Sequence, residues 1–211
     1  MFDLLSAVFM IIVLLVSVMI HEIAHGAAAA SQGDLTAKYA GRLSLNPLKH
    51  LDPIGSFLLP LILYVISRGT FVFGYAKPVP INPYNFRDRK YGEAKVAAAG
   101  AAANIALAVV FGLLLRFWPA VSNPVSAAFY ALCQVVVVVN LVLAVFNLIP
   151  IPPLDGSRIL FTFLPKSEED FKIFLQQYGF WIMLLIFYFF SDIIDPIIEF
   201  LYYLIVGAPL V

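Results

Sequence analysis

Charged residues and cysteines are scarce in this sequence, and each shortage excludes a class of protein. Asp, Glu, Lys and Arg make up 12% of the 211 residues and hydrophobic residues 62%, whereas a soluble domain is about 25% charged. The formal net charge is zero, which gives no reason to expect a nucleic acid as partner. Cys133 is the single cysteine, so a disulfide framework and a cysteine-based metal site are excluded, and its apolar surroundings predict a small packing residue. The composition indicates a protein embedded in a lipid bilayer.

Three uncharged stretches are long enough to span a bilayer, and they cover residues 4–20 (continuing to about 30), 96–115 and 117–154. A spanning helix needs about 20 residues, so the third stretch is expected to hold a helix over 126–147 and an irregular, proline-rich tail over 147–156. The stretches 178–191 and 196–210 are shorter. We predict an α-helical polytopic membrane protein with about 4–6 transmembrane or re-entrant segments. Residues 1–160 would form its core, with helices over 4–30, 96–116 and 126–147, and residues 161–211 would add C-terminal membrane segments.

The positive charges predict how these segments cross the membrane. Nine of the thirteen Lys and Arg residues lie between positions 33 and 95, and only Arg116 lies between the second and third long spans. By the positive-inside bias, the N-terminus is expected outside the cell membrane and region 33–95 mostly on its cytoplasmic side. The stretch 54–66 would then enter and return as a hairpin or re-entrant piece, or pair with a second crossing near 70–76. This topology brings the end of the 126–147 helix to the depth at which the first span ends.

Three ionisable residues occur together near the end of the first span, in the pentapeptide HEIAH at positions 21–25. Ionisable groups at membrane depth are costly and are usually retained for function. On a helix, His21 and His25 are four positions apart and share one face. Two imidazoles at that spacing can hold one Zn²⁺, and the adjacent Glu22 can act as general base on a water activated by the metal.

A catalytic zinc site needs a third protein ligand, and the sequence offers two candidates. His50 stands in a polar loop, where a surface or turn position is the favoured interpretation. Asp155 follows a run with three prolines at the depth expected for the histidines, and irregular backbone at that depth is tolerated only where protein or water satisfies it. We favour Asp155 as the ligand. The alternative is an ordinary turn at the membrane surface.

Two motifs together resemble those of the site-2 protease family of intramembrane metalloproteases. The first is HExxH at 21–25 on an early membrane helix, and the second is NxxPxPxxDG at 147–156 on a later one. The stretches 41–55 and 74–83 also resemble segments of that family. The similarity covers residues 13 to about 160.

The resemblance implies further site residues and a small sheet. It implies that Asn104 and Asn147 face the catalytic cavity and hold substrate backbone or the developing oxyanion. From the residues alone, Asn104 is equally well interpreted as a contact between helices that pack closely through small residues, and Asn140 is expected to be such a contact. Strand-like composition at 36–45 and 71–81 predicts a membrane-associated β-hairpin or small sheet within 34–95, whose edge could pair with an unwound substrate. An ordinary amphipathic loop is the alternative.

The motifs and the resemblance predict an intramembrane zinc endopeptidase with one Zn²⁺ per chain, held by His21, His25 and Asp155, and with Glu22 as its base. Its expected substrates are single-span membrane proteins already trimmed by another protease, in regulated intramembrane proteolysis. Separate proteins would select substrates, because no loop is long enough for a PDZ domain. Two alternatives remain: a membrane metal transporter with a transit site of these residues, and a non-catalytic membrane scaffold. The active site is expected toward the cytoplasmic side.

Overall fold

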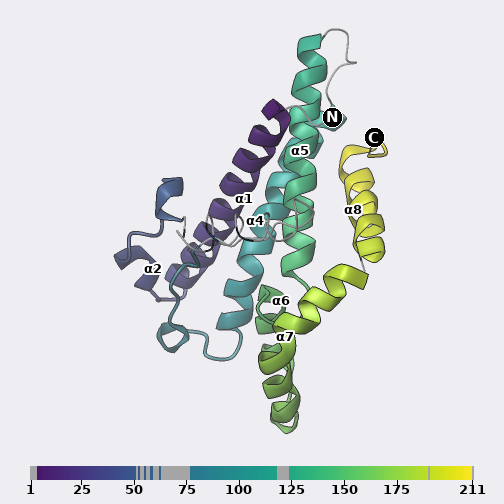
Figure 1. Cartoon of the computed structure of the whole chain (residues 1–211). Coiled ribbons are helices and arrows are strands. Elements are labelled where there is room, and N and C mark those ends of the chain that lie inside the picture. The colour runs from purple at the N-terminus through teal and green to yellow at the C-terminus, as the bar shows by residue number, and fades with distance from the viewer. Residues whose placement is uncertain are drawn as a thin grey trace.

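The computed structural model describes residues 4–50, 77–117, 124–189 and 191–210, together with the isolated positions 52, 55, 58 and 62. The longer elements are all helices (Figure 1). In chain order the α-helices are α1 (Leu4–Ser31), α2 (Thr36–Tyr39), α4 (Gly92–Arg116), α5 (Pro124–Asn147), α6 (Asp155–Phe163), α7 (Glu169–Phe189) and α8 (Ser191–Val206). Short 3-10 turns lie at η1 (Pro47–Lys49), η3 (Pro83–Asn85) and η4 (Lys166–Glu168).

Three of the described helices are long and apolar enough to cross a membrane: Val8–Ser31 within α1, Gly92–Arg116, and Ala127–Asn147 within α5. The chain is therefore a helical membrane protein, as the composition predicted. The expected spans 4–30, 96–116 and 126–147 lie within α1, α4 and α5. The predicted excursion at 54–66 lies almost entirely outside the described residues.

Helix α4 is the central element and packs against α1, α5, α6 and α8. It lies between α1 and α8, and α6 lies near its lower end in Figure 1. Helix α4 can pack against several helices because it carries a stripe of buried, mostly small residues at helical spacing, which lets neighbouring backbones approach closely. The stripe consists of Ala97, Ala101, Asn104, Ala108 and Gly112.

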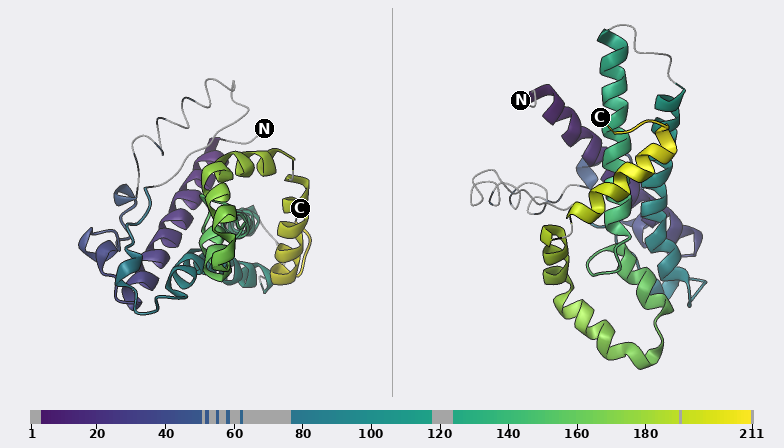
Figure 2. Two further views of the ribbon diagram at one scale, coloured as in Figure 1. Left: turned by 90° about the horizontal axis from the view of Figure 1, so that it is seen from below. Right: turned by 90° about the vertical axis from the view of Figure 1, so that its right-hand side faces the viewer.

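The largest buried apolar cluster joins α4, α5 and α8. Its buried members are Ala108, Leu115, Cys133, Val137, Leu141, Ile198, Tyr202 and Val206. Cys133 is a buried packing residue there, as predicted. The hydroxyl of Tyr202 accepts a hydrogen bond from Gln134 Nε2 at 3.0 Å, which satisfies the polar end of this buried ring. Figure 2 shows α7 and α8 wrapping around the side of the α4–α5 pair.

The predicted β-hairpin is not supported, since none of the described residues forms a strand. Within 36–45 the chain forms α2 and then turns, because Asp34 Oδ1 accepts from the Thr36 amide and Gly41 closes the turn at a φ of 66°. Residues 77–82, which we call the strap, are irregular. Pro78 and Pro80 lack the N–H groups that a strand ladder requires. Residues 71–76 lie outside the described part of the chain.

The C-terminal helices are longer than the apolar stretches predicted there. The expected segments 178–191 and 196–210 correspond to α7, which begins at Glu169, and to α8, which contains Pro196 within the helix. Gly179 of α7 lies against the tail that leads to Asp155, because a Cβ at this position would be 2.6 Å from Pro152 O. The C-terminal part of the chain therefore packs directly beside the candidate site.

Candidate metal centre

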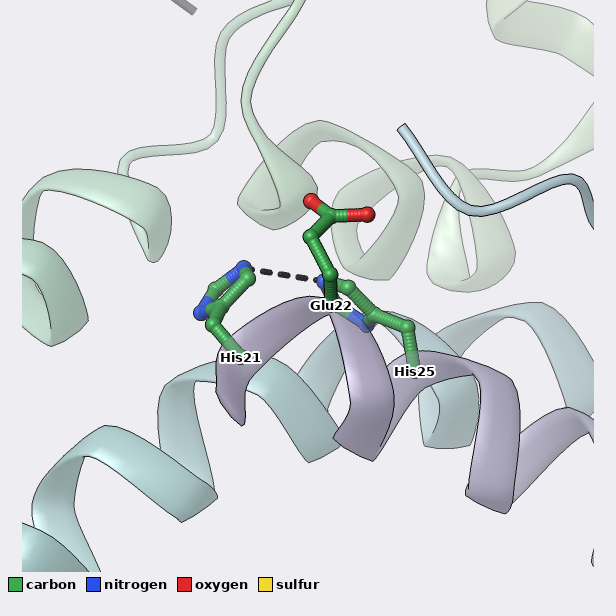
Figure 3. A group of neighbouring side chains, drawn as sticks. All are labelled: His21, Glu22 and His25. Carbon is green, nitrogen blue, oxygen red and sulfur yellow. Dashed lines mark hydrogen bonds between the residues drawn. The ribbon is translucent and has the colours of Figure 1, made fainter. Parts of the chain in front are cut away.

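Helix α1 presents two buried imidazoles on one face, four positions apart. His21 and His25 are each 6% exposed, and their Nε2 atoms are 2.9 Å apart (Figure 3). The two rings are nearly perpendicular, at 89°. Figure 3 shows that Glu22 projects from the same side of α1 as the rings.

The first residue of α6 completes a triangle of ligand atoms. Asp155 Oδ2 lies 3.0 Å from Nε2 of His21 and 2.9 Å from Nε2 of His25. His21, Glu22 and His25 also offer ligand atoms within 4.8 Å of one another. The Asp155 oxygen lies within 3.0 Å of both nitrogens, and Glu22 Oε2 accepts a hydrogen bond from the Val79 amide at 2.7 Å, so the geometry favours the prediction of Asp155 as the third ligand.

Each imidazole is oriented by an oxygen on its other side. Nδ1 of His25 lies 2.7 Å from the backbone carbonyl of Val96, and Nδ1 of His21 lies 2.6 Å from Asn104 Oδ1. A carbonyl oxygen only accepts hydrogen bonds, so each ring carries its proton on Nδ1 and directs the lone pair of Nε2 inward. Two nitrogen lone pairs and one carboxylate oxygen therefore converge within 3.0 Å. Such an arrangement can hold a cation between the three atoms.

The donor set fits zinc. Nitrogen and oxygen ligands at about 2.0–2.1 Å in a tetrahedral arrangement lie about 3.3 Å apart. The observed separations of 2.9–3.0 Å need to open by only a few tenths of an ångström.

The backbone between α5 and α6 places Asp155 at this point. After Asn147 the chain turns through residues 148–154, and Ser157 Oγ donates to Leu154 O at 2.7 Å where α6 begins. A Cβ at Gly156 would lie 2.3 Å from Leu148 O and 2.5 Å from Ile149 O. Only glycine therefore lets α6 begin close enough to the end of α5 to direct Asp155 toward the histidines.

The strap covers Glu22 and is held at both ends. Lys77 N donates to His50 O at 3.0 Å, and the Arg42 guanidinium donates to the carbonyl of Lys77. At the other end, Asn82 N donates to Asp34 Oδ2 at 2.8 Å. The Val79 amide between these anchors is therefore fixed in position against the Glu22 carboxylate.

The other predicted site residues occupy different surroundings. Asn104 is fully buried, and its described contacts are with His21, Asn140 and Ser17 rather than with Glu22. Asn147 Nδ2 donates to Leu143 O of its own helix at 2.9 Å. The substrate-binding roles of Asn104 and Asn147 remain predictions.

His50 has a structural environment in the described part of the chain. It lies in a turn, where its Nε2 is 2.8 Å from Ser44 O, and it is buried rather than on the surface.

Sequence reasoning missed the Val96 carbonyl as the partner of His25 and Ser17 as the partner of Asn104 and Asn140. Ser17 is one small polar residue in an apolar run, and a backbone carbonyl has no sequence pattern. Asn140 was expected to contact another helix, and that prediction is confirmed by its bond with Asn104.

Three apolar helices and a buried group of metal-binding side chains define a polytopic membrane protein with a metallopeptidase-like centre. The family model described as Peptidase family M50 matches residues 119–186, which include the Asp155 segment. The chain belongs to this family, that of the site-2 proteases, and is a peptidase, as the motifs predicted.

Curated relatives cover most of this chain. It is 37% identical over 183 residues to YwhC of Bacillus subtilis, named a "putative zinc metalloprotease", and the match covers 85% of this chain and 80% of YwhC. It is 31% identical over 173 residues to Rip2 of Mycolicibacterium smegmatis, which has the same description, with 82% of this chain and 63% of Rip2 covered. No solved structure matches this chain.

Proposed function

We propose that this chain is an intramembrane zinc endopeptidase that cleaves the membrane segments of other proteins. The observation that carries the proposal is the position of Asp155, whose Oδ2 lies within 3.0 Å of both imidazole Nε2 atoms although 134 positions separate it from His21. The names of YwhC and Rip2 and the donor set support zinc as the metal.

The residues of this chain would divide the chemistry between binding and proton transfer. His21, His25 and Asp155 would hold one Zn²⁺. The ion supplies Lewis acidity that activates water and polarises a peptide carbonyl. Glu22 takes a proton from the attacking water and returns it to the leaving amine. The Val79 N–H, bonded to Glu22 Oε2 at 2.7 Å, holds that carboxylate in one orientation.

Helix geometry supports a site within the bilayer. The apolar span runs from Val8 to Ser31, so His21 lies thirteen residues from one end and ten from the other. At a rise of about 1.5 Å per residue these separations are about 20 Å and about 15 Å. The hydrocarbon core is about 30 Å thick, and these lengths support a position of the imidazoles inside it. The side chains of Met10, Ile11 and Ile12 on α1 are 46–56% exposed, as expected for a surface in contact with lipid.

A substrate that reaches this depth must be unwound before it is cleaved. A transmembrane helix closes its carbonyls in internal hydrogen bonds, so single-span proteins with a locally extended segment are the proposed substrates. Regulated intramembrane proteolysis, after a first cut by another protease, is the proposed setting, with separate proteins selecting substrates. The excess of Lys and Arg in 33–95 supports a cell-membrane orientation with the N-terminus outside and the site toward the cytoplasmic side.

The deciding experiment combines cleavage with metal analysis. The full chain, purified in detergent and reconstituted in vesicles, is incubated with a panel of single-span test proteins tagged at both ends. We expect the wild type to release tagged fragments, and Glu22→Gln to bind one zinc per chain but release none. We expect Asp155→Ala to lose stoichiometric zinc and cleavage together.

The matched control is Glu93→Gln, the same change at an exposed position in the first turn of α4, which is expected to cleave like the wild type. Equal cleavage by wild type and Glu22→Gln would overturn the peptidase mechanism. Stoichiometric zinc in Asp155→Ala would remove Asp155 from the ligand set.

A further inference from the structure

A buried polar network joins the three candidate spans on the Nδ1 side of His21. It consists of Ser17 on α1, Asn104 on α4 and Asn140 on α5, and these side chains are at most 2% exposed. Asn104 Nδ2 donates to Asn140 Oδ1 at 2.8 Å and to Ser17 O at 3.3 Å. Asn140 Nδ2 donates to Ser17 Oγ at 2.9 Å and to Val136 O at 2.8 Å. At its other end the network reaches His21 Nδ1 through Asn104 Oδ1.

Two backbone carbonyls determine which way each amide faces. Val136 O and Ser17 O can only accept, so the amide atoms beside them must be the NH₂ groups of Asn140 and Asn104. Asn140 therefore presents Oδ1 to Asn104, and Asn104 presents Oδ1 to His21. A flip of either amide would place an oxygen against a carbonyl oxygen in a buried site, which costs an unsatisfied donor and a repulsive contact.

We propose that Asn104, held by Asn140 and Ser17, is a positioning residue that keeps the proton of His21 on Nδ1 and so leaves Nε2 free to bind zinc. The inference rests on the proposed function, since it takes His21 as a zinc ligand. It replaces the predicted oxyanion role of Asn104 by one in which its carbonyl oxygen contacts the histidine.

The two histidine rings are held in orientation by different kinds of acceptor. His25 is oriented by the Val96 backbone carbonyl, which no side-chain substitution removes. His21 is oriented by the Asn104 side chain of α4, which is held in turn by Asn140 of α5 and Ser17 of α1. The orientation of the His21 ring therefore depends on the packing of α1, α4 and α5 against one another.

Zinc affinity of the full-length protein in detergent tests the inference without any substrate. Partners of this kind typically change metal affinity about 10- to 100-fold. We expect Asn104→Leu, which has similar volume and no acceptor, to weaken zinc binding by that factor in competition with a chelator. Asn104→Asp keeps an oxygen against Nδ1, and its carboxyl in the protonated form places an O–H where Nδ2 donates to Asn140 Oδ1, so this variant is expected to bind within a few-fold of the wild type. Asn140→Leu acts through Asn104 and is expected to show a smaller loss.

Gln134→Leu is the matched control, because it removes a hydrogen bond between α5 and α8 that does not touch the network. Unchanged affinity in Asn104→Leu would overturn the inference, and so would an equal loss in Gln134→Leu or in Asn104→Asp. His21→Ala separates this result from the proposed function. If His21→Ala retains stoichiometric zinc, the ligand assignment itself fails, whereas loss of zinc there with full binding in Asn104→Leu rejects only the positioning role.

Discussion

Gly100 shows how closely single residues determine the metal centre. It lies on α4 against both imidazoles, and a Cβ at this position would be 2.5 Å from His21 Cε1 and 2.6 Å from His25 Cε1. Neither ring can move away freely, because each is hydrogen-bonded through Nδ1. The absence of a side chain at position 100 is therefore a requirement of the site and not only of helix packing.

We predict that Gly100→Ala weakens zinc binding. Overpacking of this kind costs about 1–3 kcal/mol, which corresponds to roughly 5- to 150-fold in affinity if it falls on the bound geometry. Chelator competition measures the effect. Gly112→Ala is the control, because its Cβ would meet Ile205 at 2.4 Å on the same helix but away from the histidines. Wild-type zinc affinity in Gly100→Ala would contradict the close approach.

Among the elements, the strap connects the region after α1 to Glu22, the proposed general base. Its central amide belongs to Val79, and its neighbours Pro78 and Pro80 have no N–H, so Val79 supplies the one amide donor of this tripeptide. Val79 is 6% exposed, and its Cγ1 would lie 3.1 Å from a Cβ at Gly26. The strap thus packs on α1 one turn beyond Glu22.

We predict that Val79→Pro slows cleavage while zinc content stays at one per chain. The change removes the donor to Glu22 Oε2, and a general base contributes about 10²–10⁴-fold to rate, so a fall of tenfold or more in kcat is expected. Val79→Ala keeps the N–H and serves as the control for lost packing. Equal rates for the two variants would show that the amide does not orient Glu22.

Asp34 connects the strap to the end of α1 by hydrogen bonds and makes the stability of this region depend on pH. Its buried carboxylate accepts hydrogen bonds from Thr36, Asn82 and Asn85. Burial alone would raise the pKa of Asp34, but these hydrogen bonds outweigh burial and lower the pKa below the ordinary value of 3.8. The stabilisation is therefore fully present above about pH 4 and is lost as pH falls through the lowered pKa.

We predict that Asp34→Ala lowers thermal stability at neutral pH, since hydrogen bonds to a charged group contribute about 1.5–3 kcal/mol each. Unfolding temperatures recorded at several pH values check this. The difference between wild type and Asp34→Ala should shrink below pH 4, where the wild-type carboxylate becomes protonated. A difference that stays constant down to pH 2 would argue against the ionised carboxylate as its source. The unfolding temperatures of Asp34→Ala are compared with those of Asp88→Ala, a change at another acidic residue whose pKa is lowered but which lies on the surface.

In the molecule as a whole, the C-terminal helices take part in building the site. Helix α8 packs on α4 and α5, and α7 places Gly179 against Pro152 in the tail that carries Asp155. The proposed metal ligands on α1 and α6 are therefore held by a framework that also includes α4, α5 and α7.

We predict that Gly179→Ala weakens zinc binding although it lies outside both motifs. A Cβ there would meet Pro152 O at 2.6 Å and push the tail that leads to Asp155. The neighbouring Phe180→Ala, at a side chain that is 45% exposed, is expected to bind zinc normally. Equal zinc affinity in the two variants would show that α7 does not support the tail.

Much of the fold and of the site could be predicted from local pattern. Apolar runs gave the positions of α1, α4 and α5, and the spacing of His21 and His25 placed both imidazoles on one face. The β-hairpin prediction is not supported by the described residues, because composition reflects the β-branched and aromatic residues but not the effect of Asp34, Gly41 and the strap prolines on the backbone.

The sequence by itself determined the class of this protein, since hydropathy and the two motifs are properties of short stretches of chain. Only the tertiary structure decided which groups complete the centre. Asn104 and Asp155 are 83 and 134 positions from His21, and their contacts arise from helix packing that no local periodicity encodes. The reason is physical: a ligand atom must be placed to a few tenths of an ångström, and that placement depends on every helix packed behind it.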